Sequence, residues 1–163
     1  MRNAFHFLFM TLALLAGSNT AASAQQAPAF SLASDNGEIS LDQYRNKIVY
    51  VDFWASWCKP CRESFSFMNE MQKKYADKGL QIIAINLDDQ RSAASAFLSK
   101  YPAQFKIAYD PQGKTPASYG VKVMPTSYLL DRKGNIIFTH KGFKQNQTDE
   151  LEQRITQAIK SQW

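Results

Sequence analysis

The sequence has 163 residues, with 19 Lys and Arg against 14 Asp and Glu, a formal net charge of +5, and two cysteines. This length suggests one domain with a well-packed core. The basic residues are scattered and form no block of like charge, so nucleic-acid binding is not indicated. Cys58, Cys61 and His140 are too few for the usual zinc ligand sets, and no metal site is expected.

The first 24 residues have the layout of a secretory signal peptide. Arg2 supplies a short positive start, residues 5–16 are almost wholly apolar, and Ala22-Ser23-Ala24 fits a small-residue cleavage site. The apolar run is shorter than the ~20 residues that span a bilayer as a helix. We therefore expect a cleaved signal peptide at 1–24, a flexible linker at 25–29 and an exported domain at 30–163. An uncleaved N-terminal membrane anchor is the alternative.

The first half of the domain contains two buried strands with a long helix between them. Residues 48–54 (IVYVDFW) are β-branched or aromatic on both faces, which is typical of a central strand covered on both sides. Phe65, Met68, Met71 and Tyr75 recur at helical spacing, and Gly79 is a helix stop signal. The expected elements are a hairpin of residues 30–32 and 38–41, a strand at 48–54, a helix at about 58–78, and a strand at 80–87.

The second half continues the alternation of helices and strands. The expected elements are a helix at 91–101, a strand at 105–109, a short helix at 114–119, antiparallel strands at 126–130 and 135–140, and a last helix at 148–160. This order predicts an α/β fold, a three-layer sandwich with a mixed central sheet flanked by helices. The N-terminal hairpin and an inserted helix-strand segment are additions to that sandwich.

Cys58 and Cys61 lie where a buried strand passes into a helix. Their spacing places both thiols on one helical face, close to the separation that a disulfide requires. As a structural crosslink, a loop this short stabilises by only about 2 kcal/mol, against about 3 for fifteen residues. The pair is therefore better interpreted as a redox couple than as a buried structural disulfide.

The surroundings of the pair indicate a division of roles. The helix N-terminus and Lys59 both favour a thiolate at Cys58, which we expect at the exposed end as the nucleophile. Cys61, one turn deeper, would resolve the mixed disulfide that forms on Cys58. Pro60 is tolerated between them because the first N–H groups of a helix have no intrahelical partner.

Asp52 is an acid inside an otherwise apolar strand. It shares a face with Tyr50 and Trp54, so its carboxyl should lie within a covering layer, where burial raises the pKa. We hypothesise that Asp52 takes the proton from Cys61, directly or through a water. The alternative is a hydrogen-bonded core residue without a catalytic role.

The segment WASWCKPC, residues 54–61, resembles the W-x-x-C-x-x-C site of the thioredoxin superfamily, and the resemblance extends over residues 30–160. A second match is Val123-Met124-Pro125-Thr126 before a strand. The resemblance implies a cis peptide bond at Pro125, next to the cysteines. It also implies that the backbone of Met124 pairs with substrate. Trp57, beside the nucleophile, is expected on the docking surface.

The export signal, the leading hairpin and residues 89–114 resemble the TlpA/ResA/DsbE-like branch of this superfamily. The branch implies a periplasmic thiol–disulfide oxidoreductase that acts on protein thiols as a reductase. It further implies electrons from a membrane thiol transporter and, in many members, cytochrome c maturation. No acidic residue precedes Pro125-Thr126, which weakens that last role. No cofactor is expected beyond the Cys58–Cys61 disulfide.

Three alternatives remain open from the sequence. Lys59 stabilises the reduced pair, which favours a thiol oxidase or isomerase of the same fold. A redoxin-type thiol peroxidase is less favoured because Ala55, not a threonine, stands three residues before Cys58. A non-catalytic binding module would use the apolar surface around Trp57 and Met124.

Overall fold

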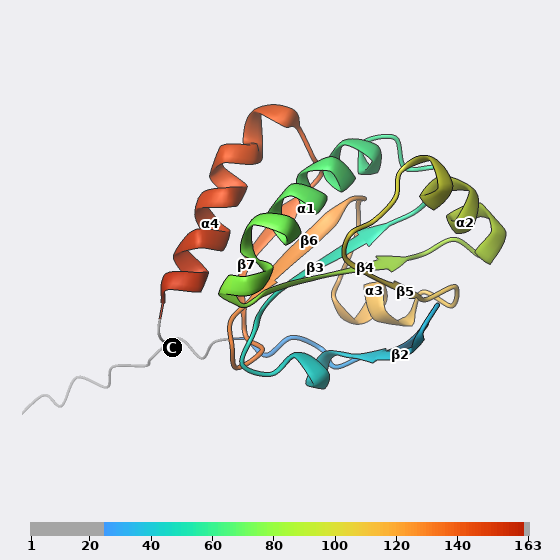
Figure 1. Ribbon diagram of the computed structural model, residues 1–163. Coiled ribbons are helices and arrows are strands. Elements are labelled where there is room, and N and C mark those ends of the chain that lie inside the picture. The colour runs from blue at the N-terminus through green and yellow to red at the C-terminus, as the bar shows by residue number, and fades with distance from the viewer. Residues whose placement is uncertain (1–24, 162–163) are drawn as a thin grey trace, which may run out of the picture.

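The computed structural model describes residues 25–161, so the expected signal peptide lies outside the described residues (Figure 1). Seven strands form one sheet in the order β2-β1-β5-β4-β3-β6-β7. The strands are β1 Ser31–Ser34, β2 Gly37–Ser40, β3 Ile48–Trp54, β4 Leu80–Asn86, β5 Lys106–Tyr109, β6 Thr126–Leu130 and β7 Ile136–Lys141. The α-helices are α1 Cys61–Tyr75, α2 Arg91–Lys100, α3 Lys114–Ser118 and α4 Thr148–Lys160.

The sheet is mixed, as predicted. β3, β4 and β5 are parallel to one another, whereas β6 pairs antiparallel with β3 and β7 pairs antiparallel with β6. The β1–β2 hairpin extends the other edge through an antiparallel pairing of β1 with β5. The central β3 is buried along its whole length, which explains its continuous apolar sequence.

Helices cover both faces of the sheet and make the three layers of the expected sandwich. Figure 1 shows α1 and α4 side by side over one face, with α3 on the other. Tyr50 and Trp54 of β3 belong to the core beneath α1 and α4, whereas Val51 and Phe53 pack on the opposite side with Tyr119. Within residues 25–161, no helix is long and apolar enough to cross a membrane.

An aromatic cluster joins the end of β3 to α1 and α2. The ring of Phe65 lies 4.8 Å from that of Trp54, 5.0 Å from that of Phe97 and 5.2 Å from that of Phe105. Such pairs contribute about 0.5–1.5 kcal/mol each beyond the burial of their area. The cluster anchors the start of α1, where the cysteines lie.

Helix α1 begins at Cys61, so the prediction of a helix from about residue 58 is wrong at this end. The N–H groups of Cys58, Cys61 and Arg62 each donate to a carbonyl three residues earlier, which makes tight turns instead of α-helix. The α-helical pattern starts where Ser64 N donates to Pro60 O at 3.2 Å. The cause is Pro60, because a proline disfavours helical geometry in the residue before it.

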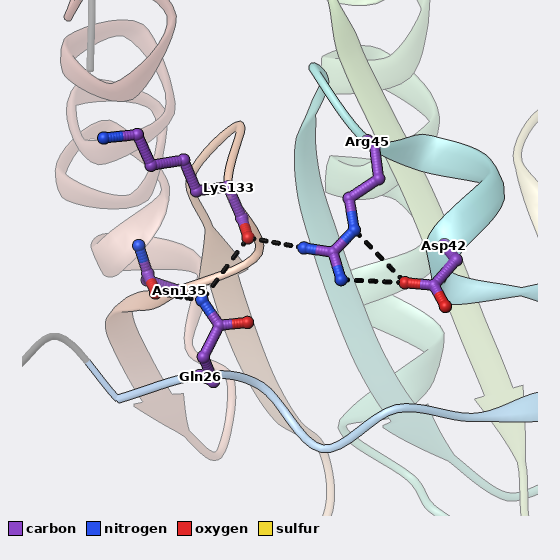
Figure 2. Close-up of polar contacts among 5 residues, drawn as sticks. All are labelled: Gln26, Asp42, Arg45, Lys133 and Asn135. Atoms are coloured by element: carbon purple, nitrogen blue, oxygen red, sulfur yellow. Dashed lines mark hydrogen bonds and ion pairs between the residues drawn. The ribbon is translucent and has the colours of Figure 1, made fainter.

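The segment 25–28 is attached to the domain, in contrast to the flexible linker that we expected. Gln26 forms an isolated β-bridge with Asn135 and its side chain contacts the β6–β7 turn (Figure 2). Arg45 binds the same turn through Lys133 O at 2.6 Å and pairs with Asp42 at 2.9 Å. Backbone hydrogen bonds to distant strands cannot be read from the polar composition of a short segment.

Asp52 lies in the middle of β3 and is 1% exposed. Its Oδ2 has no hydrogen-bond partner in the part of the chain that the structure describes. Burial raises the pKa of the Asp52 carboxyl well above its ordinary value of 3.8, and the Ser127 side chain on the neighbouring strand lowers it by less. The predicted burial of this acid within a covering layer is confirmed.

This pKa has a consequence for stability. Between the pKa of the unfolded chain, near 4, and the raised pKa of the folded state, folded Asp52 holds a proton that unfolded Asp52 releases. Its contribution to the free energy of unfolding therefore falls as pH rises through this window, by up to about 1.4 kcal/mol per pH unit. We predict that Asp52→Asn, which cannot ionise, matches the oxidised wild type near pH 4 and is more stable than it at higher pH, measured from pH 4 to pH 8. Urea titrations across this range measure the difference, and a gap that does not change with pH would contradict the prediction.

Candidate active site

Cys58 and Cys61 form a disulfide at the carboxyl end of β3, with a Cα–Cα distance of 5.4 Å. Cys58 belongs to a turn of residues 55–60, here called the active-site turn, and Cys61 is the first residue of α1. Cys58 is 4% exposed and Cys61 is fully buried. The expectation of an exposed Cys58 at the tip of the helix is therefore wrong in this oxidised form. The tight turns before α1 fold Cys58 inward, against the core.

The two cysteines nevertheless differ in access. Cys58 lines a groove of about 790 Å³, here called the active-site groove, and Cys61 does not. Lys59 and Pro60 lie on the same rim as Cys58. Lys59 is exposed, so solvent screens its effect on a thiolate at Cys58. The N-terminus of α1 and Lys59 still supply positive potential at this end of the sheet.

The peptide bond between Met124 and Pro125 is cis, as the resemblance implied. It directly precedes β6, whose first residue, Thr126, pairs with Phe53 near the end of β3. The cis bond therefore lies at the same end of the strands as Cys58. Met124 and Cys58 both line the active-site groove. Gly142 N donates to Pro125 O at 2.7 Å and holds this loop to the end of β7.

The active-site groove is mainly apolar. Leu87, Pro116 and Val121 lie along it, between the active-site turn and the loop that carries the cis bond. Trp57 is 69% exposed and Val123 is 50% exposed, and both belong to the same groove. An exposed cluster of apolar side chains around a reactive disulfide is typical of a surface that binds protein partners.

Asp52 lies on the same side of the sheet as the two cysteines. It is on the face of β3 that carries Tyr50 and Trp54, and the core on that face includes both cysteines. The Tyr50 hydroxyl donates to Ser127 Oγ at 2.7 Å, and Ser127 is the cross-strand neighbour of Asp52. Burial raises the pKa of the Tyr50 hydroxyl, and the neighbouring Asp52 raises it further. The result is a small polar group enclosed within the cysteine-bearing layer.

Sequence reasoning missed a second buried acid at the site. Asp88, just after β4, accepts hydrogen bonds from Ser56 N at 2.9 Å and from Ser56 Oγ at 2.8 Å. Asn86 Nδ2 donates to Asp88 Oδ2 at 2.7 Å. One sequence signal could have found this acid. Polar residues just after a parallel strand lie beside the carboxyl end of the neighbouring parallel strand. Asn86 and Asp88 meet that description.

Residues 22–155 match the Redoxin family. The thiol-disulfide oxidoreductase ResA of Bacillus thuringiensis is 37% identical over 134 residues, which cover 81% of this chain and 78% of that protein. The thioredoxin-like protein YneN of Bacillus subtilis is 41% identical over 135 residues, 80% of this chain and 77% of that protein.

Among solved structures, one described as a thiol:disulfide interchange protein DsbE from Chlorobium tepidum superposes with a TM-score of 0.82 at 48% identity. The match covers 83% of this chain and 96% of the other. The mixed sheet flanked by helices and the Cys58–Cys61 disulfide agree with these similarities. The chain therefore belongs to the Redoxin family and is a ResA- and DsbE-like thiol–disulfide oxidoreductase of the thioredoxin superfamily.

Proposed function

We propose that this protein is a periplasmic reductase that passes two electrons from Cys58 and Cys61 to disulfides in partner proteins. The observation that carries the proposal is the position of the disulfide: only Cys58 of the pair lines the apolar groove beside the cis bond. One sulfur is thus presented to a partner, while the other is held behind it.

The exchange takes two steps. In the reduced protein, the Cys58 thiolate attacks a partner disulfide, an S–S bond forms between the two proteins, and the partner's second sulfur leaves as a thiolate. Cys61 then loses its proton and attacks the Cys58 sulfur, which closes the Cys58–Cys61 disulfide and releases the partner's other thiol. The partner gains two electrons, and a thiol donor must return two electrons and two protons to the pair.

Asp52 is suited to take the proton in the second step. A general base works best when its pKa lies near the working pH. Burial raises the pKa of the Asp52 carboxyl from its low ordinary value, which is a shift toward neutral pH. Asp52 Oδ2 has no hydrogen-bond partner among residues 25–161, so it is available to a thiol or to a water. Asp52 is on the side of the sheet whose core contains Cys61, and at 1% exposure it is closed to the outer surface.

The active-site groove is suited to an extended segment of a partner protein. Among the described residues, none forms a hydrogen bond with the backbone of Met124, so its N–H and C=O are free to pair with a strand-like segment. Trp57 and Val123 offer apolar contacts on either side. Lys59 and Lys122 are the charged residues of this lining.

The proposed direction of electron flow and location rest on the resemblance to the ResA- and DsbE-like branch and on the expected signal peptide. Relatives named ResA and DsbE are thiol–disulfide oxidoreductases and interchange proteins. Residues 1–24 have the layout of a signal peptide, which supports a proposed location in the periplasm and a membrane thiol donor. Service to cytochrome c maturation is a use that the resemblance to this branch implies. A peroxidase role is less well supported, because the buried Ala55 offers no hydroxyl near Cys58.

Trapping tests the exchange itself. In Cys61→Ser the first attack proceeds and resolution is blocked, so a mixed disulfide on Cys58 should accumulate in the periplasm. Non-reducing gels and mass spectrometry would identify the partner and the linked cysteine. Cys58→Ser is the control and should trap nothing and lose all disulfide reductase activity. Partner binding and cellular function that survive in Cys58→Ser would reject the proposal in favour of a binding module.

Separate rates for the first attack and for the resolution step test the role of Asp52. Asp52→Asn cannot accept a proton, so we expect resolution of a preformed mixed disulfide at pH 7 to slow by about 10²-fold, as general-base losses do. The first attack by Cys58 should stay within about twofold, because that thiolate needs no internal base. Stopped-flow measurements on each step decide the matter, and equal slowing of both steps would refute the role.

The direction of flow is visible in cells. A reductase with an active donor should be recovered mainly with Cys58 and Cys61 reduced, since the donor reduces the disulfide again after each exchange. Acid quenching followed by alkylation with a mass-shifting thiol reagent reports this ratio. A pair that is persistently oxidised, in cells that contain the export and electron-supply machinery, would indicate an oxidase instead.

A further inference from the structure

Asp88 is a buried carboxylate that the exchange steps above do not use. It is 7% exposed and follows β4 by two residues. Its oxygens accept three hydrogen bonds, from Ser56 N, Ser56 Oγ and Asn86 Nδ2, at 2.9, 2.8 and 2.7 Å. A buried carboxylate is costly unless its oxygens are hydrogen-bonded, and here both are. The group is therefore held in one place at the end of the sheet.

The residue that Asp88 holds belongs to the active-site turn. Ser56 is two residues before Cys58 and directly before the exposed Trp57. Asp88 binds both polar groups of Ser56, its backbone N–H and its hydroxyl, one on each carboxylate oxygen. Two-point binding of this kind fixes orientation as well as distance, because a rotation of Ser56 would break one of the two bonds.

The support for Asp88 comes from β4 itself. Asn86 donates to the Asp88 carboxylate through Nδ2 and accepts from Asp88 N through Oδ1 at 3.1 Å. Leu87 N, between them, donates to Trp54 O at the end of β3 at 2.9 Å. The turn before Cys58 is thus attached to the end of a rigid central strand by backbone and side-chain bonds together.

We propose that Asp88 is a positioning residue for thiol–disulfide exchange: held by Asn86, it binds Ser56 and fixes the active-site turn so that Cys58 faces the groove. Attack on a disulfide requires the incoming sulfur to align with the S–S bond, and misplacement by about 1 Å can reduce a rate by 10²-fold. Asp88 acts through Ser56 and touches no reacting atom. The inference rests on Cys58 as the nucleophile, one part of the proposed function.

The first test replaces the acceptor. Asp88→Asn keeps the size of the side chain but turns one acceptor into a donor, which then opposes the donors of Ser56. We expect the reduced variant to react with oxidised glutathione at least about tenfold more slowly than wild type. The matched control is Asp131→Asn. Asp131 is 6% exposed and also accepts three hydrogen bonds, but it follows β6 at the opposite end of the strands from the active site.

Asp131→Asn should lower the free energy of unfolding and leave the glutathione rate within about twofold of wild type. A second pair of variants keeps the proposal testable if Asp88→Asn does not fold. Ser56→Ala removes one of the two bonds to Asp88 and should slow the reaction several-fold. Ser56→Thr restores a hydroxyl and should recover most of the wild-type rate, which a general loss of stability would not explain.

The outcomes separate this proposal from the assignment of the nucleophile. Alkylation of the reduced wild type with iodoacetamide, followed by mass spectrometry, should label Cys58 first. Labelling of Cys61 would overturn that assignment. Labelling of Cys58, together with an Asp88→Asn rate no lower than that of Asp131→Asn, would overturn the positioning role alone. Equal rates for Ser56→Ala and Ser56→Thr, both far below wild type, would also overturn it.

Discussion

The pairing of β3 with its two neighbours is the constraint on which the site depends. β3 and β4 are parallel, with Trp54 opposite Asn86, so the chain leaves both strands at the same end of the sheet. β6 is antiparallel to β3 and starts at this same end, where Thr126 pairs with Phe53. Three separate segments therefore meet there: the active-site turn, the segment around Asp88 and the loop with the cis bond. A shift of register in either pairing would separate them.

Two buried carboxylates, Asp52 within β3 and Asp88 just after β4, differ in their surroundings. Asp52 has an oxygen without a hydrogen-bond partner within residues 25–161, and burial raises its pKa. Asp88 has both oxygens hydrogen-bonded, to Ser56 and Asn86. An acid with an open oxygen can exchange a proton, whereas one whose oxygens are all occupied is suited to holding structure. These surroundings support the proposed proton transfer by Asp52 and the proposed positioning role of Asp88.

The strands and helices of this fold were largely predictable, because each carries a strong local signal. The continuous apolar run of β3 and the helical spacing of Phe65, Met68 and Met71 in α1 are such signals. The cysteine pair stood out because it is the only one in the chain. The cis geometry at Pro125 needed the family resemblance, since sequence alone favours a trans bond at a proline. The boundaries were less predictable, as the late start of α1 shows.

The sequence by itself determined the alternation of strands and helices, the redox pair and the acid in the central strand. These are properties of single segments, which composition and periodicity record. Only the tertiary structure decided that Cys58 is nearly buried, that residues 25–28 pair with the β6–β7 turn, and that Asp88 holds Ser56. Each of these is a contact between segments far apart in the chain. Hydrogen bonds and burial of that kind arise from strand register and packing, and no local pattern encodes them.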